Sequence, residues 1–157
     1  MAHYAQLGVD NIVTRVWTVN NIDCMTVGGI EKDEIGQAYL KEHHGDLTLV
    51  KCSYNTSKGV HVLGGTPFRA NYPGVGWYYS STHNIFYEPR PKDKNGNDCN
   101  SWTLNTTTGM YDPPISYPNA APLEYWTWDE SVYNLSLIHI SEPTRPRLIS
   151  YAVFCLK

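Results

Sequence analysis

An aromatic phrase that appears three times between residues 76 and 134 constrains this chain more than any other feature. The tryptophans that lead the copies are Trp77, Trp102 and Trp126, which lie 25 and 24 residues apart. In the first two copies a second aromatic residue follows nine positions later, at Phe86 and Tyr111. Each copy has an aromatic-rich run, a polar turn and a second short run, which is the pattern of a two-stranded β-hairpin. The sequence therefore predicts three consecutive hairpins.

The turn and proline residues of the repeat support this prediction. In the middle copy, Trp102 and Leu104 share one face of a strand, and Gly109 permits a positive φ in the turn. Proline residues follow the first two copies and end their strands, because proline has no backbone N–H to donate. One hairpin alone is marginal in water, so three in succession are expected to stack on one another or on a partner. The aromatic rings then form either a core or an exposed binding platform.

The third copy breaks off where the pattern calls for an aromatic residue, because position 135 is leucine. From there residues 135–146 spell LSLIHISEPTRP, which resembles the translated read-through of a sequencing-library adapter in proteins assembled from environmental reads. Segments of that kind are excluded from fold reasoning. We therefore expect residues 135–157 to be non-native and the natural C-terminus to be missing. The alternative is a genuine β-strand at residues 148–156.

The first 70 residues predict a small α+β unit. A hairpin is expected from residues 4–7 and 12–19, in which Val13, Trp17 and Val19 share one face. After a Gly-Gly break, residues 31–44 predict a helix, with acidic residues in its first turn and basic residues in its last.

Gly45 is a natural stop for this helix. Its apolar face is expected to comprise Ile35, Ala38 and Tyr39, and further strands are expected over residues 48–54 and 60–63. The expected fold class is therefore β-rich α+β. A unit with one helix over residues 1–70 precedes hairpin repeats over residues 71–134.

Charge and cysteine content exclude several classes of function. The chain has 12 Lys and Arg residues against 15 Asp and Glu residues, so it is a poor candidate for binding nucleic acid through phosphates. It contains no long apolar run to span a membrane, and no apolar signal region near its start, so we expect a soluble protein made in the cytoplasm. Outside the tail, Cys24, Cys52 and Cys99 match no metal or redox spacing and are expected to be free thiols.

Histidine and cysteine residues offer weak candidates for chemistry. His43 and His44 are adjacent on the predicted helix and point about 100° apart, without a third ligand, so solvated side chains are favoured over a metal site. Cys52 with His61 suggests a thiol nucleophile and a base, but nothing nearby activates the thiol. We expect no metal and no cofactor.

Acidic residues offer two further candidates. Residues 93–98 have the composition of a calcium loop, but glycine stands at the fourth place and Leu104 replaces the closing glutamate, so a plain turn is favoured. Glu124, Asp129 and Glu130 lie near two tryptophans, an arrangement compatible with glycosidase carboxylates or with ordinary turn acids. We expect no catalytic residue and no enzymatic activity. Asn55 and Asn105 begin glycosylation sequons that are more simply turns.

Several phrases of the chain resemble one family. They are residues 1–7 with 11–13, 53–55, 68–76, 101–105 and 128–130. In this order they are similar to small, mostly uncharacterised proteins from tailed phages of marine bacteria, including cyanobacterial phages. The resemblance covers nearly all of residues 1–134. It departs in residues 92–100, which look like an insertion between the first two repeats.

The resemblance implies a virion structural role and supplies no catalytic residues. The leading expectation is a decoration, fibre-associated or tail-associated subunit that docks on other virion proteins or on itself through the aromatic repeats. The alternative is a module that binds a host surface glycan or receptor on exposed aromatic rings. Both hypotheses use the same six residues. They are Trp77, Tyr78, Trp102, Tyr111, Trp126 and Trp128.

Overall fold

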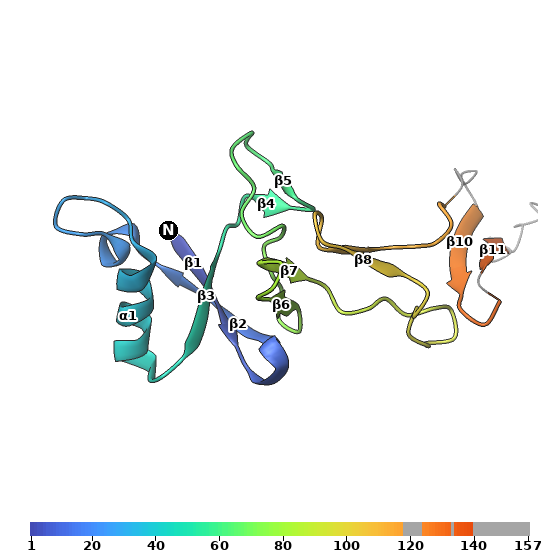
Figure 1. Ribbon diagram of the computed structural model, residues 1–157, viewed down its shortest axis with the longest axis horizontal. Coiled ribbons are helices and arrows are strands. Elements are labelled where there is room, and N and C mark those ends of the chain that lie inside the picture. Colours follow the sequence, from blue (N-terminus) through green and yellow to red (C-terminus); the bar gives the residue numbers. More distant parts are fainter. Residues whose placement is uncertain (118–123, 133, 140–157) are drawn as a thin grey trace, which may run out of the picture.

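The computed structural model describes residues 1–117, 124–132 and 134–139. These residues form a β-rich α+β fold with an elongated shape (Figure 1). The helix α1 (Asp33–His44) and a three-stranded sheet lie at one end, and the hairpins follow one another towards the other end. This confirms the fold class expected from the sequence. No helix among the described residues is long and apolar enough to cross a membrane.

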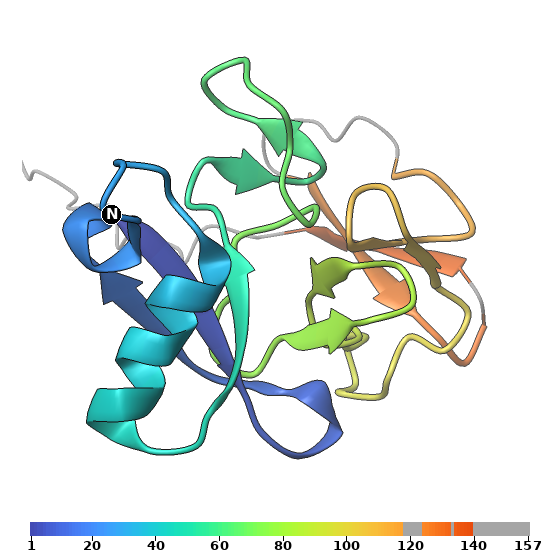
Figure 2. The same cartoon turned by 60° about the vertical axis from the view of Figure 1, so that its left-hand side comes forward.

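The sheet contains β1 (Ala2–Leu7), β2 (Val13–Val19) and β3 (Thr48–Cys52) in the order β2-β1-β3, with both pairings antiparallel. The helix α1 covers one face of this sheet (Figure 2). Two short 3₁₀ turns, Val9–Asn11 and Asn21–Cys24, connect these elements. The buried side chains between helix and sheet are Ala2, Tyr4, Val19, Cys24, Leu40 and Leu49.

The face assigned to Val13 from periodicity was wrong. The pairing of β1 with β2 runs from Ala2 opposite Val19 to Gln6 opposite Arg15, and then Leu7 stands opposite Val13. Thr14 is therefore the extra residue of a β-bulge, which reverses the inward and outward alternation beyond it. Val13 is fully buried on the sheet face opposite to the helix, whereas Trp17 packs on the helix side.

The buried face of α1 also differs from the expected one. The buried residues are Gly36 and Leu40, and Tyr39 packs against the same core as expected. Ala38 is exposed and Ile35 is half-buried. A Cβ atom added at Gly36 would lie 2.8 Å from Cζ of Tyr4 and 2.9 Å from Sγ of Cys24. Glycine therefore lets the helix approach the sheet closely, which an apolar periodicity cannot reveal. The helix ends as expected at Gly45, which has a φ of 88°.

The three aromatic hairpins are present, and their loops have the same length. The first comprises β6 (Tyr78–Ser80) and β7 (Ile85–Tyr87), the second β8 (Thr103–Asn105) and β9 (Met110–Asp112), and the third β10 (Glu124–Asp129) and β11 (Asn134–His139). Their closing pairs are Ser80–Ile85, Asn105–Met110 and Asp129–Asn134. Four residues therefore separate the closing pair of each hairpin, and Gly109 has the positive φ expected for its turn, 65°.

Residues 135–139, which the sequence marks as non-native, lie in β11 and pair with β10. The rest of the expected tail, including the alternative strand at 148–156, lies outside the described residues. A further small hairpin, β4 (Thr56–Ser57) with β5 (Val60–His61), follows β3 in the sequence and precedes the first aromatic hairpin.

The first aromatic hairpin covers the second face of the sheet. Phe86 is fully buried there, among Ala5, Leu7, Val13 and Cys52. The chain just before β6 is also tied to β2, because Val13 N donates to the carbonyl of Trp77 at 2.7 Å. The sheet therefore lies between α1 and the first repeat. The cluster around Phe86 contains residues from both of the units expected from the sequence, 1–70 and 71–134.

Candidate functional site

The six candidate aromatic residues are all at least partly buried. Trp77 packs against the sheet beside Phe86. Tyr78 stacks on Tyr87 across the first hairpin, with ring centroids 5.5 Å apart and an angle of 21° between the planes. The first repeat thus uses its rings for its own packing, as core residues do.

The second and third repeats meet through tryptophan side chains. Trp102 and Trp128 form an edge-to-face pair with centroids 6.1 Å apart. Trp128 is only 2% exposed, whereas Trp126 is half-buried. Tyr117 also contacts Trp102 edge-on, at 6.3 Å. The structure therefore brings Trp102 and Trp128 together.

Arg90 connects the first two repeats. Its guanidinium carbon lies 4.6 Å from the ring centroid of Tyr111, a cation–π contact. Its Nη1 donates to the carbonyls of Cys99 and Trp102, each at 2.8 Å. The guanidinium therefore covers one face of the Tyr111 ring and leaves less of it available to a ligand. Beside it lies a hollow of about 80 Å³ lined by Trp102, Met110 and Tyr111 with neighbouring prolines.

The loop between the first two repeats fastens the third hairpin. The carboxylate of Glu130 accepts hydrogen bonds from Ser101 N, Ser101 Oγ and Trp128 Nε1, each at 2.7 Å. Lys94 Nζ forms an ion pair with Asp129 at 2.8 Å, and Lys94 N donates to the carbonyl of Trp128 at 3.2 Å. The apparent insertion at residues 92–100 thus holds the turn of the third repeat against the second.

Asp93 organises the same loop from within. Its Oδ1 accepts from Asn95 N and Asn97 N, each at 2.8 Å, and its Oδ2 accepts from Asn97 Nδ2 and, at 3.4 Å, from Glu130 N. The carboxylate thus accepts three hydrogen bonds from its own turn and one from the third hairpin. No group of three or more possible metal-ligating side chains occurs in the part of the chain that is described.

Hydrogen bonding lowers the pKa of these three carboxyl groups. The ammonium of Lys94, followed by the hydroxyl of Ser131, lowers the pKa of Asp129 to about 2. Burial by itself raises the pKa of Asp93 and of Glu130, but the donors that surround each carboxylate outweigh it and lower the pKa. All three groups are therefore carboxylates at neutral pH, and neither Asp129 nor Glu130 is suited to act as a general acid. The side chain of Glu124 lies outside the described residues.

We expect the contact between this loop and the third hairpin to weaken as the pH falls from about 5 towards 2. The folded pKa values of Asp93, Asp129 and Glu130 lie below the unfolded ones, about 3.9 for Asp and 4.3 for Glu. Their stabilisation is therefore complete above the unfolded values and is lost as the pH falls through the folded values. The indole Nε1–H resonance of Trp128, followed by NMR, reports directly on its bond to Glu130.

Two variants test this titration. Asp129→Asn is the test variant, and Asp46→Asn is its control. Asp129→Asn removes the ion pair with Lys94 and should begin the change at a higher pH. Asp46 is 98% exposed, and its replacement should leave the Trp128 resonance unchanged. A Trp128 resonance that stays constant down to pH 2 in the unaltered chain would contradict the role given to these carboxylates.

His43 and His44, expected to be solvated side chains at the end of the helix, make separate contacts. His43 Nδ1 lies 2.8 Å from the carbonyl oxygen of Tyr39, and the ring of His44 stacks on Trp17 with centroids 4.2 Å apart. Cys24, Cys52 and Cys99 are free and buried, as expected. Cys52 and His61 line the same hollow, but burial raises the pKa of the Cys52 thiol to about 12, so it stays protonated at neutral pH.

Sequence reasoning missed the segment that joins the sheet to the repeats. Asn71 is 3% exposed, and its Oδ1 accepts from Lys58 N at 2.6 Å. Its Nδ2 donates to the carbonyls of Phe86, at 3.1 Å, and Thr108, at 2.8 Å. One side chain therefore ties together the turn of β4–β5, the first hairpin and the loop of the second. The only local signal was the unusual density of aromatic and turn residues between 68 and 76.

Comparisons with protein-family models, curated proteins and solved structures found no match to this chain.

Proposed function

We propose that this chain is an accessory structural subunit of a phage particle, a decoration, fibre-associated or tail-associated protein that docks on a larger assembly through its hairpins. The observation that carries the proposal is the row formed by the first two hairpins and β10, which are bound to one another by Arg90 and by the loop at residues 92–101. Such a row presents an extended surface for contact with another protein (Figure 1). Apart from Asn134, the return strand β11 lies in the segment expected to be non-native, so the proposal does not rest on it. The phrases that resemble marine phage proteins supply the virion context.

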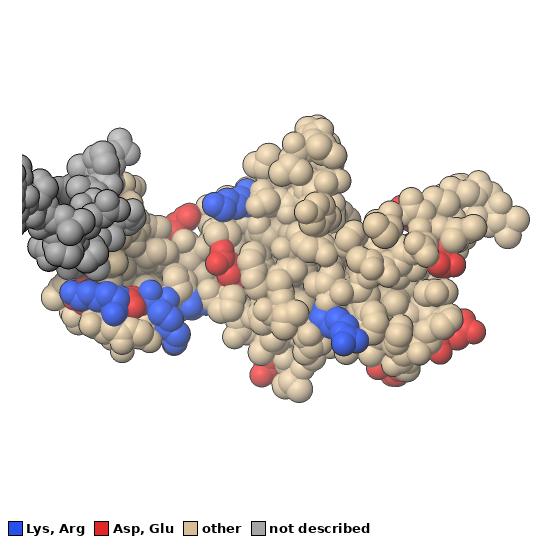
Figure 3. Space-filling model, turned by 180° about the vertical axis from the view of Figure 1, so that it is seen from behind, with Lys and Arg blue, Asp and Glu red and all other residues tan. Residues whose placement is uncertain are grey.

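The surface of the hairpin row suits an interface. Each aromatic hairpin is a sheet of two strands, and outer strand edges are templates for pairing with another chain. Exposed apolar side chains accompany the repeats at Val75, Ile115, Tyr117 and Val132. Charged side chains are sparse over the middle of the face shown in Figure 3, whereas Lys and Arg side chains gather at the end that carries the later hairpins. Interfaces are depleted of charge at their centres and enriched in aromatic residues.

The glycan-binding alternative at the six candidate residues finds less support. A sugar ring stacks on an open aromatic face, but Trp128 is buried, Tyr78 is stacked on Tyr87, and the guanidinium of Arg90 lies over Tyr111. The rings of the repeats are therefore engaged with their own chain. Docking on an assembly needs only their edges and the neighbouring strands.

The experiment is peptide mass spectrometry of gradient-purified marine virus particles, searched for the tryptic peptide of residues 70–92. The proposal predicts this peptide in intact particles at a constant ratio to capsid peptides across the gradient. Host cytoplasmic proteins serve as the control for contamination. Detection in lysates of infected cells alone would contradict the virion role. Particles that contain residues 70–92 without any peptide from 135–157 would support a non-native tail.

A further inference from the structure

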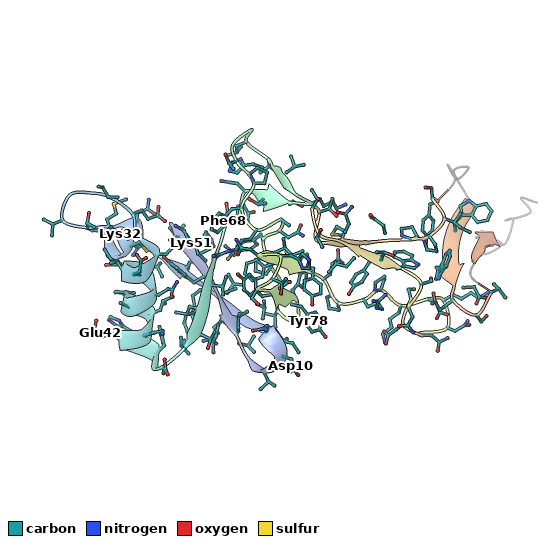
Figure 4. All side chains as sticks on the ribbon, viewed as in Figure 1. Asp10, Lys32, Glu42, Lys51, Phe68 and Tyr78 are labelled. Atoms are coloured by element: carbon teal, nitrogen blue, oxygen red, sulfur yellow. The ribbon has the colours of Figure 1, made fainter. Side chains whose placement is uncertain are left out.

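A hollow of about 490 Å³ lies where the start of β1, the end of β3 and the loop after β5 meet, and its lining includes no residue of the hairpin row. Its size falls within the range of about 300–1,000 Å³ that is usual for small-molecule sites. Figure 4 shows Lys51 and Phe68 close together at this position. The lining residues used below are His3, Glu31, Lys51, Tyr54, His61 and Phe68.

The aromatic wall of this hollow is both open and fixed. Tyr54 is 71% exposed, which is unusual for a ring that makes several ordered contacts. Its ring meets Tyr72 edge-on at 5.4 Å and lies nearly parallel to His3 at 6.2 Å. Tyr72 in turn lies edge-on to His3 at 5.4 Å, and its hydroxyl is 3.1 Å from His3 Nδ1. Tyr54 thus presents a broad aromatic surface in a preset position, which lowers the entropy cost of stacking a ligand on it.

The polar groups of the hollow supply both donors and acceptors. Lys51 Nζ bonds to Glu31 at 2.7 Å and to Asp33 at 2.8 Å, so two carboxylates surround one ammonium. His61 Nδ1 accepts from Leu63 N at 3.3 Å and from Gly65 N at 3.0 Å. Because Nδ1 accepts these two hydrogen bonds, Nε2–H is the group of this ring that can donate to a ligand.

The charge of the hollow selects among ligand classes. Lys51 and the terminal ammonium of Met1 stand against the carboxylates of Glu31 and Asp33, so the charges nearly cancel and no net charge attracts phosphate, sulfate or carboxylate groups. Burial, and after it that ammonium, lowers the pKa of His3, so this ring adds no further positive charge at neutral pH. A ligand that fits needs no charge, needs an apolar face for Tyr54, and needs hydroxyl groups that both donate and accept. A pyranose ring has these properties.

We propose that the hollow beside Tyr54 binds a neutral hexose ring of a glycan. The ring stacks on Tyr54, and its hydroxyl groups bond to the Glu31 carboxylate, the Lys51 ammonium and the His61 Nε2–H. This site differs from the platform expected on the repeat tryptophans. It also does not depend on the assembly role proposed above, because no residue of the hairpin row lines the hollow.

The experiment is saturation-transfer difference NMR on the full chain, with irradiation of aromatic protein resonances. The probes are methyl α-D-glucopyranoside, methyl α-D-mannopyranoside and methyl β-D-galactopyranoside, with glucuronate and adenosine as comparisons. We expect transfer to the ring protons of at least one hexoside, and weaker transfer to glucuronate, because Glu31 lines the hollow and repels its carboxylate. Absence of transfer to all three hexosides, or stronger transfer to adenosine or to glucuronate, would overturn the proposal.

Matched variants locate the signal. Tyr54→Ala should reduce the transfer at least fivefold, and Tyr54→Phe, which keeps the ring, should retain it. Tyr117→Ala is the control on the hairpin row, because Tyr117 is also an exposed tyrosine, at 42%. Transfer that is retained in Tyr54→Ala and lost in Tyr117→Ala would place sugar binding on the repeats and contradict this site. Circular dichroism of each variant checks that the fold is intact, since Tyr54 is too exposed to be essential for it.

Discussion

Replacing Asn71 with leucine is expected to destabilise the chain by about 2–4 kcal/mol, because one buried and two part-buried backbone groups lose their partner. The amide of Asn71 satisfies the N–H of Lys58 and the carbonyls of Phe86 and Thr108. Leucine has a similar volume, so the loss comes from unsatisfied polar groups rather than from a cavity. A small domain has a total stability of about 5–15 kcal/mol, so this is a large fraction of it.

Urea unfolding followed by circular dichroism measures this loss. Asn71→Asp is an informative second variant, because it keeps the acceptor for Lys58 N but turns a carboxylate oxygen towards the carbonyls of Phe86 and Thr108. It should therefore destabilise the chain at pH 7 and recover partly when the carboxyl group is protonated at lower pH. Asn100→Ala, at an exposed position, should stay within about 0.5 kcal/mol of the original chain. If Asn71→Leu lowered the free energy of unfolding by less than about 1 kcal/mol, the three hydrogen bonds of Asn71 would not be important for stability.

Local sequence signals predicted the elements of the fold well, for physical reasons that can be named. The hairpins follow from aromatic runs separated by polar turns, and Gly109 adopts the positive φ that its turn needs. The helix follows from its acidic first turn and from Gly45 at its end. Each of these signals acts between residues that are close in the sequence, so a pattern can reveal it.

The connections between elements had no such signal. The bonds of Asn71 to Thr108 and of Ser101 to Glu130 span 37 and 29 residues. Such contacts join one polar side chain to one distant backbone group and leave no period in the sequence. The same limit explains why the aromatic repeats identified candidate residues without revealing that Trp128 is buried and that the Tyr111 ring lies under Arg90.

The bulge at Thr14 illustrates a different limit. Alternation along β2 assigns Val13 to the helix side, but one extra residue opposite Gln6 and Leu7 moves it to the other face. This displacement is what lets Val13 pack with Phe86 of the first repeat. The contact between the sheet and the first repeat thus depends on a β-bulge, which an alternating pattern of apolar residues does not predict.

Replacing Gly36 with alanine is expected to destabilise the chain by about 2 kcal/mol, although alanine is the better helix former. The helix gains about 1 kcal/mol from the higher propensity of alanine. Against this, the new methyl group would collide with the hydroxyl of Tyr4 and lie 2.8 Å from its Cζ and 2.9 Å from Cys24 Sγ, in a fully buried environment. Overpacking of this kind costs about 3 kcal/mol, so the steric effect outweighs the propensity.

A double-mutant cycle with Tyr4→Phe separates the two effects. Removing the Tyr4 hydroxyl deletes the closest contact of the new methyl group, so the loss caused by Gly36→Ala should shrink by at least about 1 kcal/mol in the Tyr4→Phe background. Gly28→Ala is the control, because its added Cβ would lie no closer than 3.7 Å to Thr26 Oγ1. Equal losses for Gly36→Ala in both backgrounds would show that the helix does not approach the sheet at Tyr4. A net gain in stability would mean that the helix shifts without cost, and the close approach at Gly36 would then not be what positions α1 on the sheet.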